Sequence, residues 1–189
     1  MKTSHVILAV LAGVLTVASQ IVFSDDDHDR GSRKSKLFER TPDVAVARDA
    51  VYTKECGECH FAYQPGLLPE RSWRKVMSHL NDHFGDNAEL AAPKHEQILN
   101  YLVANSAEHG GFRRSAKILK SLGANDAPER ITDTPYIRRK HDEVPDRMIK
   151  ANDQIRSLSN CNACHTKAAD GSYSEHEVRI PGRAGRWED

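Results

Sequence analysis

The sequence predicts a mainly α-helical protein with two small domains, and three observations lead to that prediction. Apolar residues recur at steps of three and four in several segments, as they do on the buried face of a helix. No segment shows the apolar–polar alternation that marks a half-buried strand. A motif of two cysteines and a histidine occurs twice, about a hundred residues apart, once in each half of the chain.

Helix signals are strongest in the first half of the chain. Residues 42–56 are expected to form a helix that Pro42 and Asp43 begin and that the first cysteine motif ends. Residues 69–84 and 92–106 also repeat apolar side chains at helical spacing, and a proline near the start of the latter segment suits a first helical turn.

The second half of the chain is expected to contain much irregular structure. Residues 113–122 and 146–161 have helical patterns, whereas residues 128–146 are interrupted by three prolines. A proline removes a backbone donor and restricts the residue before it, so only short helices can form between these positions.

The N-terminal residues have the features of an export signal. Residues 1–24 contain a cation near the start, an unbroken apolar run, and then small and polar residues. Because the apolar run is about as long as a membrane span, an uncleaved anchor is the alternative to a cleaved signal peptide. Residues 25–40 are charged and poor in apolar residues, and we expect them to form a disordered linker.

The boundary between the two domains is predicted from chain breakers. Gly110 and Gly111 follow a helical segment and lie between the two cysteine motifs. We therefore place the first domain at residues 41–110 and the second at residues 111–189. Each domain then contains one cysteine motif.

Composition excludes some classes of function. The chain has 27 Lys and Arg against 27 Asp and Glu, with 7 against 10 in residues 40–110 and 15 against 12 in residues 111–189. A nucleic-acid-binding protein would concentrate more positive charge on one face. Only 39% of the residues are hydrophobic and 6% are aromatic, so the core would be thin without a bound group.

Both cysteine motifs have the form Cys-x-x-Cys-His, and together they use all four cysteines of the chain. In an exported protein this pattern indicates covalent c-type haem, because the two thiols add to the haem vinyl groups and the histidine becomes an iron ligand. Two motifs predict two c-type haems. The predicted attachment residues are Cys56, Cys59 and His60 in the first motif, and Cys161, Cys164 and His165 in the second.

Zinc binding and a redox dithiol are alternatives that fit the pattern less well. Zinc sites made of two cysteine pairs usually separate the pairs by about 15–20 residues. A thioredoxin-like dithiol is expected beside a βαβ unit, which this sequence lacks. Neither alternative explains the histidine that follows each cysteine pair.

The second axial ligand of the first haem is predicted from the helix expected at residues 69–84. On a helical projection of that segment, His83 lies at the edge of the apolar face and His79 lies farther round, towards solvent. His95 is a rival ligand, although a structural role at a helix start explains it better. Met77 lies inside the apolar stripe and is expected to pack in the core.

For the second haem the nearby candidates are His141, Met148 and His176. His141 lies in a proline-bounded segment with too few apolar residues to fold by burial alone, and a metal bond would hold such a segment in place. A solvated basic run is the alternative explanation for His141. Met148 has the character of an ordinary amphipathic-helix position.

Beyond the haem motifs, the sequence resembles the bacterial periplasmic dihaem cytochromes c, which fold as two single-haem domains. The similarity covers roughly residues 49–182, and the run "CHFAYQPGLLP" is far more specific than the haem motifs alone. The tail "GRAGRWED" and the charged linker lie outside it. The segments that carry the resemblance are "CGECHFAYQPGLLPERSWRKVM", "DHFGDNAEL", "RITDTPYIRRKHDE", "CNACH" and "EHEVRIPG".

The resemblance implies two cytochrome c-like haem domains in which both irons have two histidine ligands, with His83 and His141 matching the family's distal positions. It also implies a periplasmic electron carrier rather than an enzyme. The partners implied are other haem proteins, including an oxygen-binding monohaem cytochrome c or a membrane b-type cytochrome. No nucleic acid is expected to bind, and membrane contact is expected only if the signal is uncleaved.

Two other classes of function remain as alternatives. One is a haem enzyme or gas-binding haem protein in which one iron stays five-coordinate. The other is a structural subunit whose haems support a larger membrane complex. For an electron carrier, the basic residues Arg138, Arg139 and Lys140, beside His141, are a candidate docking surface for an acidic partner.

Overall fold

The computed structural model describes residues 41–183, which belong to one compact unit spanning Arg40–Asp189. The predicted signal peptide at residues 1–24 and the linker at residues 25–40 lie outside the described residues. Within residues 41–183, none of the helices has the length and apolar character needed to cross a membrane.

The described residues form a helical structure without extended sheets, as the sequence predicts. Within them, the only β pairings are isolated bridges between His83 and Asp86 and between His165 and Val178. The α-helices are α1 (Ala50–Gly57), α2 (Glu70–Ser78), α3 (Ala92–Ala104), α4 (Arg113–Lys120), α5 (Pro135–Lys140), α6 (Asp146–Lys150) and α7 (Cys161–Cys164). Short 3₁₀ helices lie at Pro65–Leu67, Leu80–Asp82, Ile131–Asp133, Ala168–Asp170 and Glu175–Glu177.

Helix α1 begins later than the sequence predicts. Its N-cap is Asp49, whose side chain accepts a hydrogen bond from the backbone N–H of Tyr52 at 2.7 Å. The prediction of a helix starting at Pro42 is wrong, because the chain there pairs with a distant loop instead. The backbone N–H groups of Asp43 and Val44 both donate to the carbonyl of Gly171, at 2.9 and 3.2 Å.

Helix α2 ends earlier than the sequence predicts, at Ser78 rather than near Phe84. A tight turn replaces the last predicted turns of helix, since Phe84 has φ of 60° and Gly85 has φ of 102°. The backbone N–H of His83 donates to the carbonyl of Asp86 at 2.7 Å and closes this turn. The helix-face argument for His83 therefore does not hold, because His83 lies beyond the helix.

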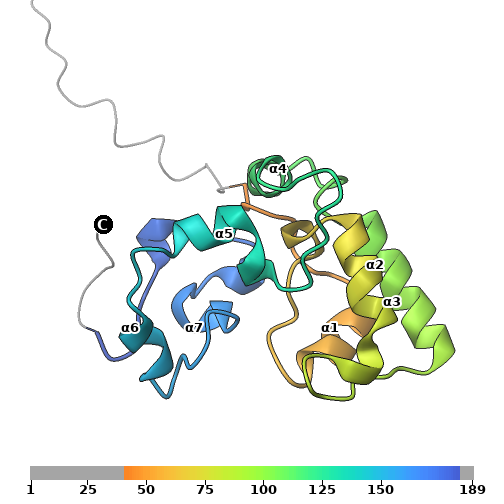
Figure 1. Ribbon diagram of the computed structural model, residues 1–189, viewed down its shortest axis with the longest axis horizontal. Helices are drawn as coiled ribbons and strands as arrows, with labels where there is room; N and C mark the ends of the chain where they lie inside the picture. Colours follow the sequence, from red (N-terminus) through yellow and green to blue (C-terminus); the bar gives the residue numbers. More distant parts are fainter. Residues whose placement is uncertain (1–40, 184–189) are drawn as a thin grey trace, which may run out of the picture. The chain divides into compact units, whose positions relative to one another are not determined.

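Helices α2 and α3 pack against each other and form the core of the first half (Figure 1). Trp73 and Met77 of α2 and Ile98 and Leu102 of α3 are all buried. The bounds of α3 confirm the helix predicted at residues 92–106. In Figure 1, α1, α2 and α3 lie together on one side of the unit, whereas α5, α6 and α7 lie on the other.

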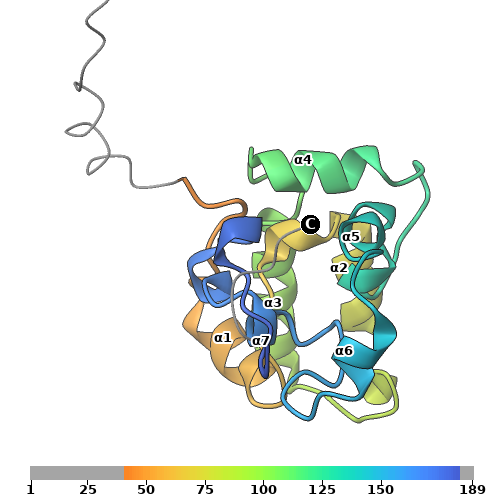
Figure 2. The same cartoon turned by 90° about the vertical axis from the view of Figure 1, so that its left-hand side faces the viewer.

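The second half contains short helices joined by irregular segments, as predicted. Helix α4 confirms the helix expected at residues 113–122, and it lies across one end of the unit (Figure 2). The helix predicted at residues 146–161 is wrong in length, because α6 ends at Lys150. The chain then turns at Asn152, whose side-chain amide donates to the carbonyl of Pro181 at 2.8 Å and whose side-chain oxygen accepts from the backbone N–H of Gln154 at 3.0 Å.

Two hydrophobic clusters fill the described unit. The larger draws on both halves of the chain, and Cys56 and Cys161, one from each motif, pack against it. The smaller consists of Ile149, Ile155 and Ile180 and contacts Cys164. The division into domains at residue 110 stays a prediction. The buried members of the larger cluster are Val44, Tyr52, Leu67, Leu68, Trp73, Met77, Leu80, Ile98, Leu102, Ile118, Ile131, Tyr136, Ala168 and Tyr173.

Candidate haem sites

The first cysteine motif lies where α1 ends. Cys56 occupies the last turn of the helix and is partly buried, whereas Cys59 and His60 follow the helix and are exposed. Cys56 and Cys59 form no disulfide with each other, and burial raises the pKa of the Cys56 thiol to about 11. Reactive dithiols have lowered pKa values instead, so this thiol does not resemble a redox cysteine.

His60 and His83 face each other at this motif. Their ring centres are 6.2 Å apart, and their planes make an angle of 27°. The Nδ1 atom of His60 lies 2.8 Å from the carbonyl oxygen of Phe61, and this bond fixes the tautomer with the proton on Nδ1. We refer to Cys56, Cys59, His60 and His83 as the first site.

The second cysteine motif forms α7 itself, and its histidine follows at once. The backbone N–H of His165 donates to the carbonyl of Cys161 at 2.9 Å, and that of Arg179 donates to the carbonyl of Cys164 at 2.9 Å. These bonds hold the motif against the C-terminal segment. Burial raises the pKa of Cys161 to about 11, as it does at the first motif.

His141 faces His165 at the second motif. Their ring centres are 6.0 Å apart, and their planes make an angle of 77°. His141 caps the C-terminus of α5, and its Nδ1 atom lies 2.8 Å from the carbonyl oxygen of Ile137. We refer to Cys161, Cys164, His165 and His141 as the second site.

The separation of each histidine pair fits two ligands on opposite sides of one metal ion. A metal–imidazole bond is about 2.1 Å long, and the ring centre lies about 1.1 Å beyond the bound nitrogen, which places two such ring centres about 6.4 Å apart. The observed separations of 6.2 and 6.0 Å are within a few tenths of an ångström of that value. The hydrogen bonds from Nδ1 of His60 and His141 leave Nε2 of each ring free to bind a metal, the usual arrangement in metal-binding histidines.

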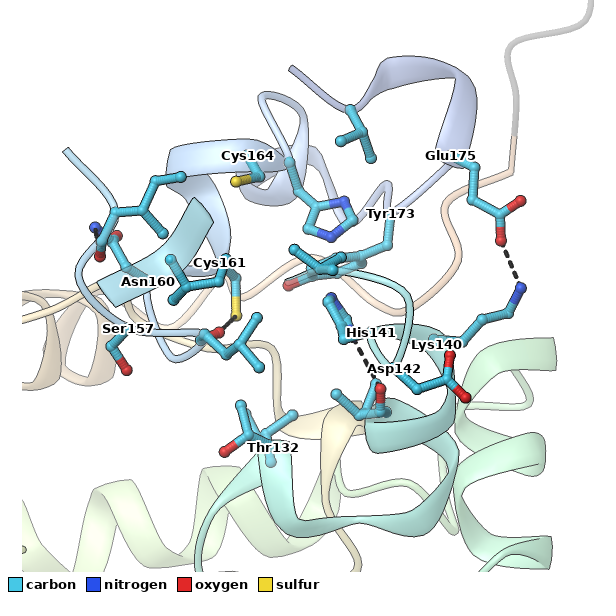
Figure 3. Close-up of a pocket in the computed structure, with 18 of the residues that line it drawn as sticks. Thr132, Lys140, His141, Asp142, Ser157, Asn160, Cys161, Cys164, Tyr173 and Glu175 are labelled. Atoms are coloured by element: carbon cyan, nitrogen blue, oxygen red, sulfur yellow. Dashed lines mark hydrogen bonds and ion pairs between the residues drawn. The ribbon is translucent and has the colours of Figure 1, made fainter. Parts of the chain in front are cut away.

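A cavity of about 200 Å³ lies at the second site. Figure 3 shows the side chains of Cys161, His141 and Tyr173 directed into it. Much of its wall is apolar and comes from both hydrophobic clusters. The apolar lining includes Leu67, Ile131, Ile137, Val144, Ile149, Ile155, Leu158, Val178 and Ile180.

Two buried nitrogen atoms of residues that line this cavity have no hydrogen-bond partner among the described residues. They are Nδ1 of His165 and Nε of Arg114. A buried polar atom without a partner costs free energy, so a bound group that satisfies it would stabilise the site. Burial, followed by the nearby His141 and Arg114, lowers the pKa of His165 to about 4, so its imidazole is neutral at pH 7 and can donate an electron pair.

The remaining predicted candidates lie away from the two sites or in the core. His79 is exposed and lies 3.6 Å from the carboxylate of Glu129. The Nε2 atom of His95 lies 2.9 Å from the carbonyl oxygen of Met77, and Met77 itself is buried in the core. These positions agree with the surface, structural and packing roles expected from the sequence.

Met148 and His176, the other two candidate ligands of the second haem, lie in surroundings that explain them without a bound iron. Met148 lies in α6 and packs against the smaller hydrophobic cluster. His176 lies in the 3₁₀ helix Glu175–Glu177 and is exposed.

The sequence did not single out a group of side chains that supports the second site. The ring centre of Tyr173 lies 5.3 Å from that of His165, and its hydroxyl contacts the side chain of Gln64. Arg114 donates to the Asp43 carboxylate and to the carbonyl of Tyr173, both at 3.1 Å. The run "CHFAYQPGLLP" contains Gln64, so this run is the part of the sequence that could have indicated the group.

A helical chain with two Cys-x-x-Cys-His motifs, each beside a second histidine, has the form of a c-type cytochrome with two haems. The family model for dihaem cytochrome c matches residues 52–173, and the chain belongs to that family. Its cofactors are accordingly two c-type haems, and the chain is a haem-based electron carrier.

Solved structures of other dihaem cytochromes are similar to this chain. A dihaem cytochrome c from Shewanella baltica OS155 is 38% identical with a TM-score of 0.62, and the match covers 76% of this chain and 100% of that chain. A dihaem cytochrome c from Rhodobacter sphaeroides is 44% identical with a TM-score of 0.61, and the match covers 68% of this chain and 98% of that chain. Comparison with curated proteins gives no match.

Proposed function

We propose that this protein is an exported electron carrier whose two haem irons are each bound by two histidines. His60 and His83 would bind the first iron, and His165 and His141 would bind the second. The observation that carries the proposal is the separation of the ring centres, 6.2 and 6.0 Å, which suits two ligands across one ion.

Covalent attachment follows from the position of the cysteines. The thiols of Cys56 and Cys59 would hold the first haem beside His60, and those of Cys161 and Cys164 would hold the second beside His165. When bound, haem supplies an iron that changes its charge by one electron, with a potential tuned by its axial ligands and surroundings.

The chain's own residues would keep each iron coordinated and exclude other ligands. Hydrogen bonds to backbone carbonyls fix the imidazoles of His60 and His141, and the burial of His165 keeps it neutral. Two histidines bound to each iron would leave no coordination position for a substrate or a gas. This arrangement supports electron transfer rather than enzymatic turnover.

The periplasm is the proposed location, and another haem protein is the proposed partner. The location rests on the export signal predicted at residues 1–24, and the partner rests on the need of an electron carrier for a donor and an acceptor. Arg138 and Arg139 are exposed at the end of α5, next to His141, whereas Lys140 is paired with Glu175 at 2.5 Å. The two arginines would therefore contribute most to the docking of an acidic partner.

Carbon monoxide binding to the reduced protein tests the ligand assignment. The unmodified protein is expected to bind none, and His83→Ala and His141→Ala are each expected to bind one molecule per chain, because each variant frees one position on one iron. His79→Ala is the matched control, since His79 is an exposed histidine four residues before His83 in the sequence, and it is expected to bind none. Carbon monoxide binding by the unmodified protein would instead support a five-coordinate haem and a gas-binding or enzymatic function.

A further inference from the structure

Tyr63 contacts the first candidate haem site and the segment that leads into the second. Its ring stacks on the imidazole of His60, with ring centres 4.9 Å apart and planes at 23°. Its hydroxyl donates a hydrogen bond of 2.7 Å to the carbonyl of Ser159, two residues before Cys161. One side chain thus reaches from the proximal histidine of the first site to the backbone that leads into the second.

The surroundings of Tyr63 fix its position. The hydroxyl of Tyr52, a buried residue of α1, donates to the carbonyl of Tyr63 at 2.5 Å. The side-chain amide of the next residue, Gln64, donates to the carbonyl of Ala168 at 2.5 Å. The backbone of Tyr63 is therefore held on both sides, and its side chain has little freedom to move away from either site.

We propose that Tyr63 is a positioning residue that couples the two haem sites of this electron carrier. Its ring fixes the plane of the His60 imidazole, and its hydroxyl holds the segment before Cys161 at a set distance from the first site. This inference rests on the proposed function. When an electron passes between the sites, one site is oxidised and the other reduced, and no bond of Tyr63 forms or breaks.

The two contacts of Tyr63 can be separated by substitution. Tyr63→Phe keeps the aromatic stack on His60 and removes only the hydrogen bond to the Ser159 carbonyl. Tyr63→Leu removes both contacts. One aromatic contact and one hydrogen bond are a small part of the contacts that stabilise the fold, so neither substitution is expected to unfold a chain whose haems are covalently attached.

Tyr101→Phe provides a matched control. The Tyr101 hydroxyl also has one backbone partner, the N–H of Arg48 at 3.0 Å. Tyr101 packs beside Tyr52, with ring centres 5.4 Å apart. The control removes one hydroxyl from a tyrosine that has no ring contact with His60.

The experiment measures both reduction potentials and both low-spin paramagnetic-resonance signals in the intact dihaem protein. His83→Ala and His141→Ala assign each signal and potential to a site. Tyr63→Phe is expected to shift the potential of the second site and to leave the first-site signal unchanged. Tyr63→Leu is expected to alter the first-site signal as well, because the plane of His60 is released, and the Tyr101→Phe control is expected to change neither.

The inference is overturned if the second site has the same reduction potential in Tyr63→Phe as in the Tyr101→Phe control. It is also overturned if Tyr63→Leu retains the first-site signal of the unmodified protein. Failure of the proposed function would be seen separately, because the unmodified protein would then lack two haems or two low-spin signals.

Discussion

Replacing Gly171 with alanine should destabilise the protein by about 3–4 kcal/mol. Gly171 has φ of 74°, and a left-handed backbone costs an alanine about 1–2 kcal/mol. A Cβ atom at this position would also collide with the carbonyl oxygen of Val44. Moving Val44 away would break the two hydrogen bonds that Asp43 and Val44 donate to the Gly171 carbonyl, at about 1 kcal/mol each.

The loss of these hydrogen bonds should also change the surroundings of the second site. Asp43 accepts hydrogen bonds from the backbone N–H of Tyr173 at 2.7 Å and from Arg114 at 3.1 Å. Tyr173 in turn faces His165, with ring centres 5.3 Å apart. Displacing Asp43 would therefore weaken the hydrogen bond that positions Tyr173, whose ring packs against the predicted iron ligand His165.

Denaturant unfolding of the dihaem protein, followed by circular dichroism, measures this effect. Gly111→Ala is the matched control, because Gly111 also has a positive φ, of 64°, but nothing lies within 4 Å of the added carbon. Gly111→Ala should lower the free energy of unfolding only by the roughly 1–2 kcal/mol that a left-handed alanine costs. The free energies of unfolding of the two variants should therefore differ by about 2 kcal/mol. Equal losses in the two variants would refute the argument that the close approach of Val44 matters.

Two further predictions concern acid and salt. Because the pKa of His165 is lowered from 6.5 to about 4, protons compete for it about 300-fold less well than for an ordinary imidazole. Protonation frees a ligand only as the pH falls through its pKa, so in His141→Ala, where His165 is the one histidine left on the second iron, that ligand should stay bound at least down to about pH 4, and its loss near pH 6.5 would contradict this. Electron transfer to an acidic haem partner should slow as salt rises, because charges are screened over about 8 Å at physiological ionic strength. Reversing the charge of Arg138 and Arg139 should slow it at low salt without changing either haem spectrum, and a rate indifferent to both changes would place the docking surface elsewhere.

Periodicity predicted which segments are helical better than where the helices end. Helix α3 lies where apolar spacing places it, because its pattern continues over several turns. Helix α2 stops at Ser78, although apolar residues continue to Phe84, because the backbone of His79 leaves helical angles (φ −122°, ψ 28°) and a 3₁₀ helix and a positive-φ turn follow. Residues 42–49 are non-helical because their backbone donors pair with Gly171, a long-range contact that local pattern does not encode.

The two haem motifs could be predicted because their chemistry lies in five consecutive residues. His83 required the family resemblance, since the helical projection that favoured it assumed a helix that ends before it. His141 was also indicated by its proline-bounded segment, which has few apolar residues. The connection through Tyr63 could not be predicted, because its two partners, His60 and Ser159, are separated by about a hundred residues and meet only in the folded chain. Spacing in sequence carries no information about such a contact.

A low-temperature paramagnetic-resonance spectrum of the oxidised protein, with the spins counted against the protein concentration, tests the coordination of both irons most directly. Two low-spin ferric irons per chain and no high-spin iron are expected. Two different signals are also expected, because nearly parallel imidazoles split the iron d orbitals more than nearly perpendicular ones, and the planes of the two histidines make angles of 27° at the first site and 77° at the second. A high-spin signal, or fewer than two low-spin irons per chain, would contradict the assignment of two histidines to each iron.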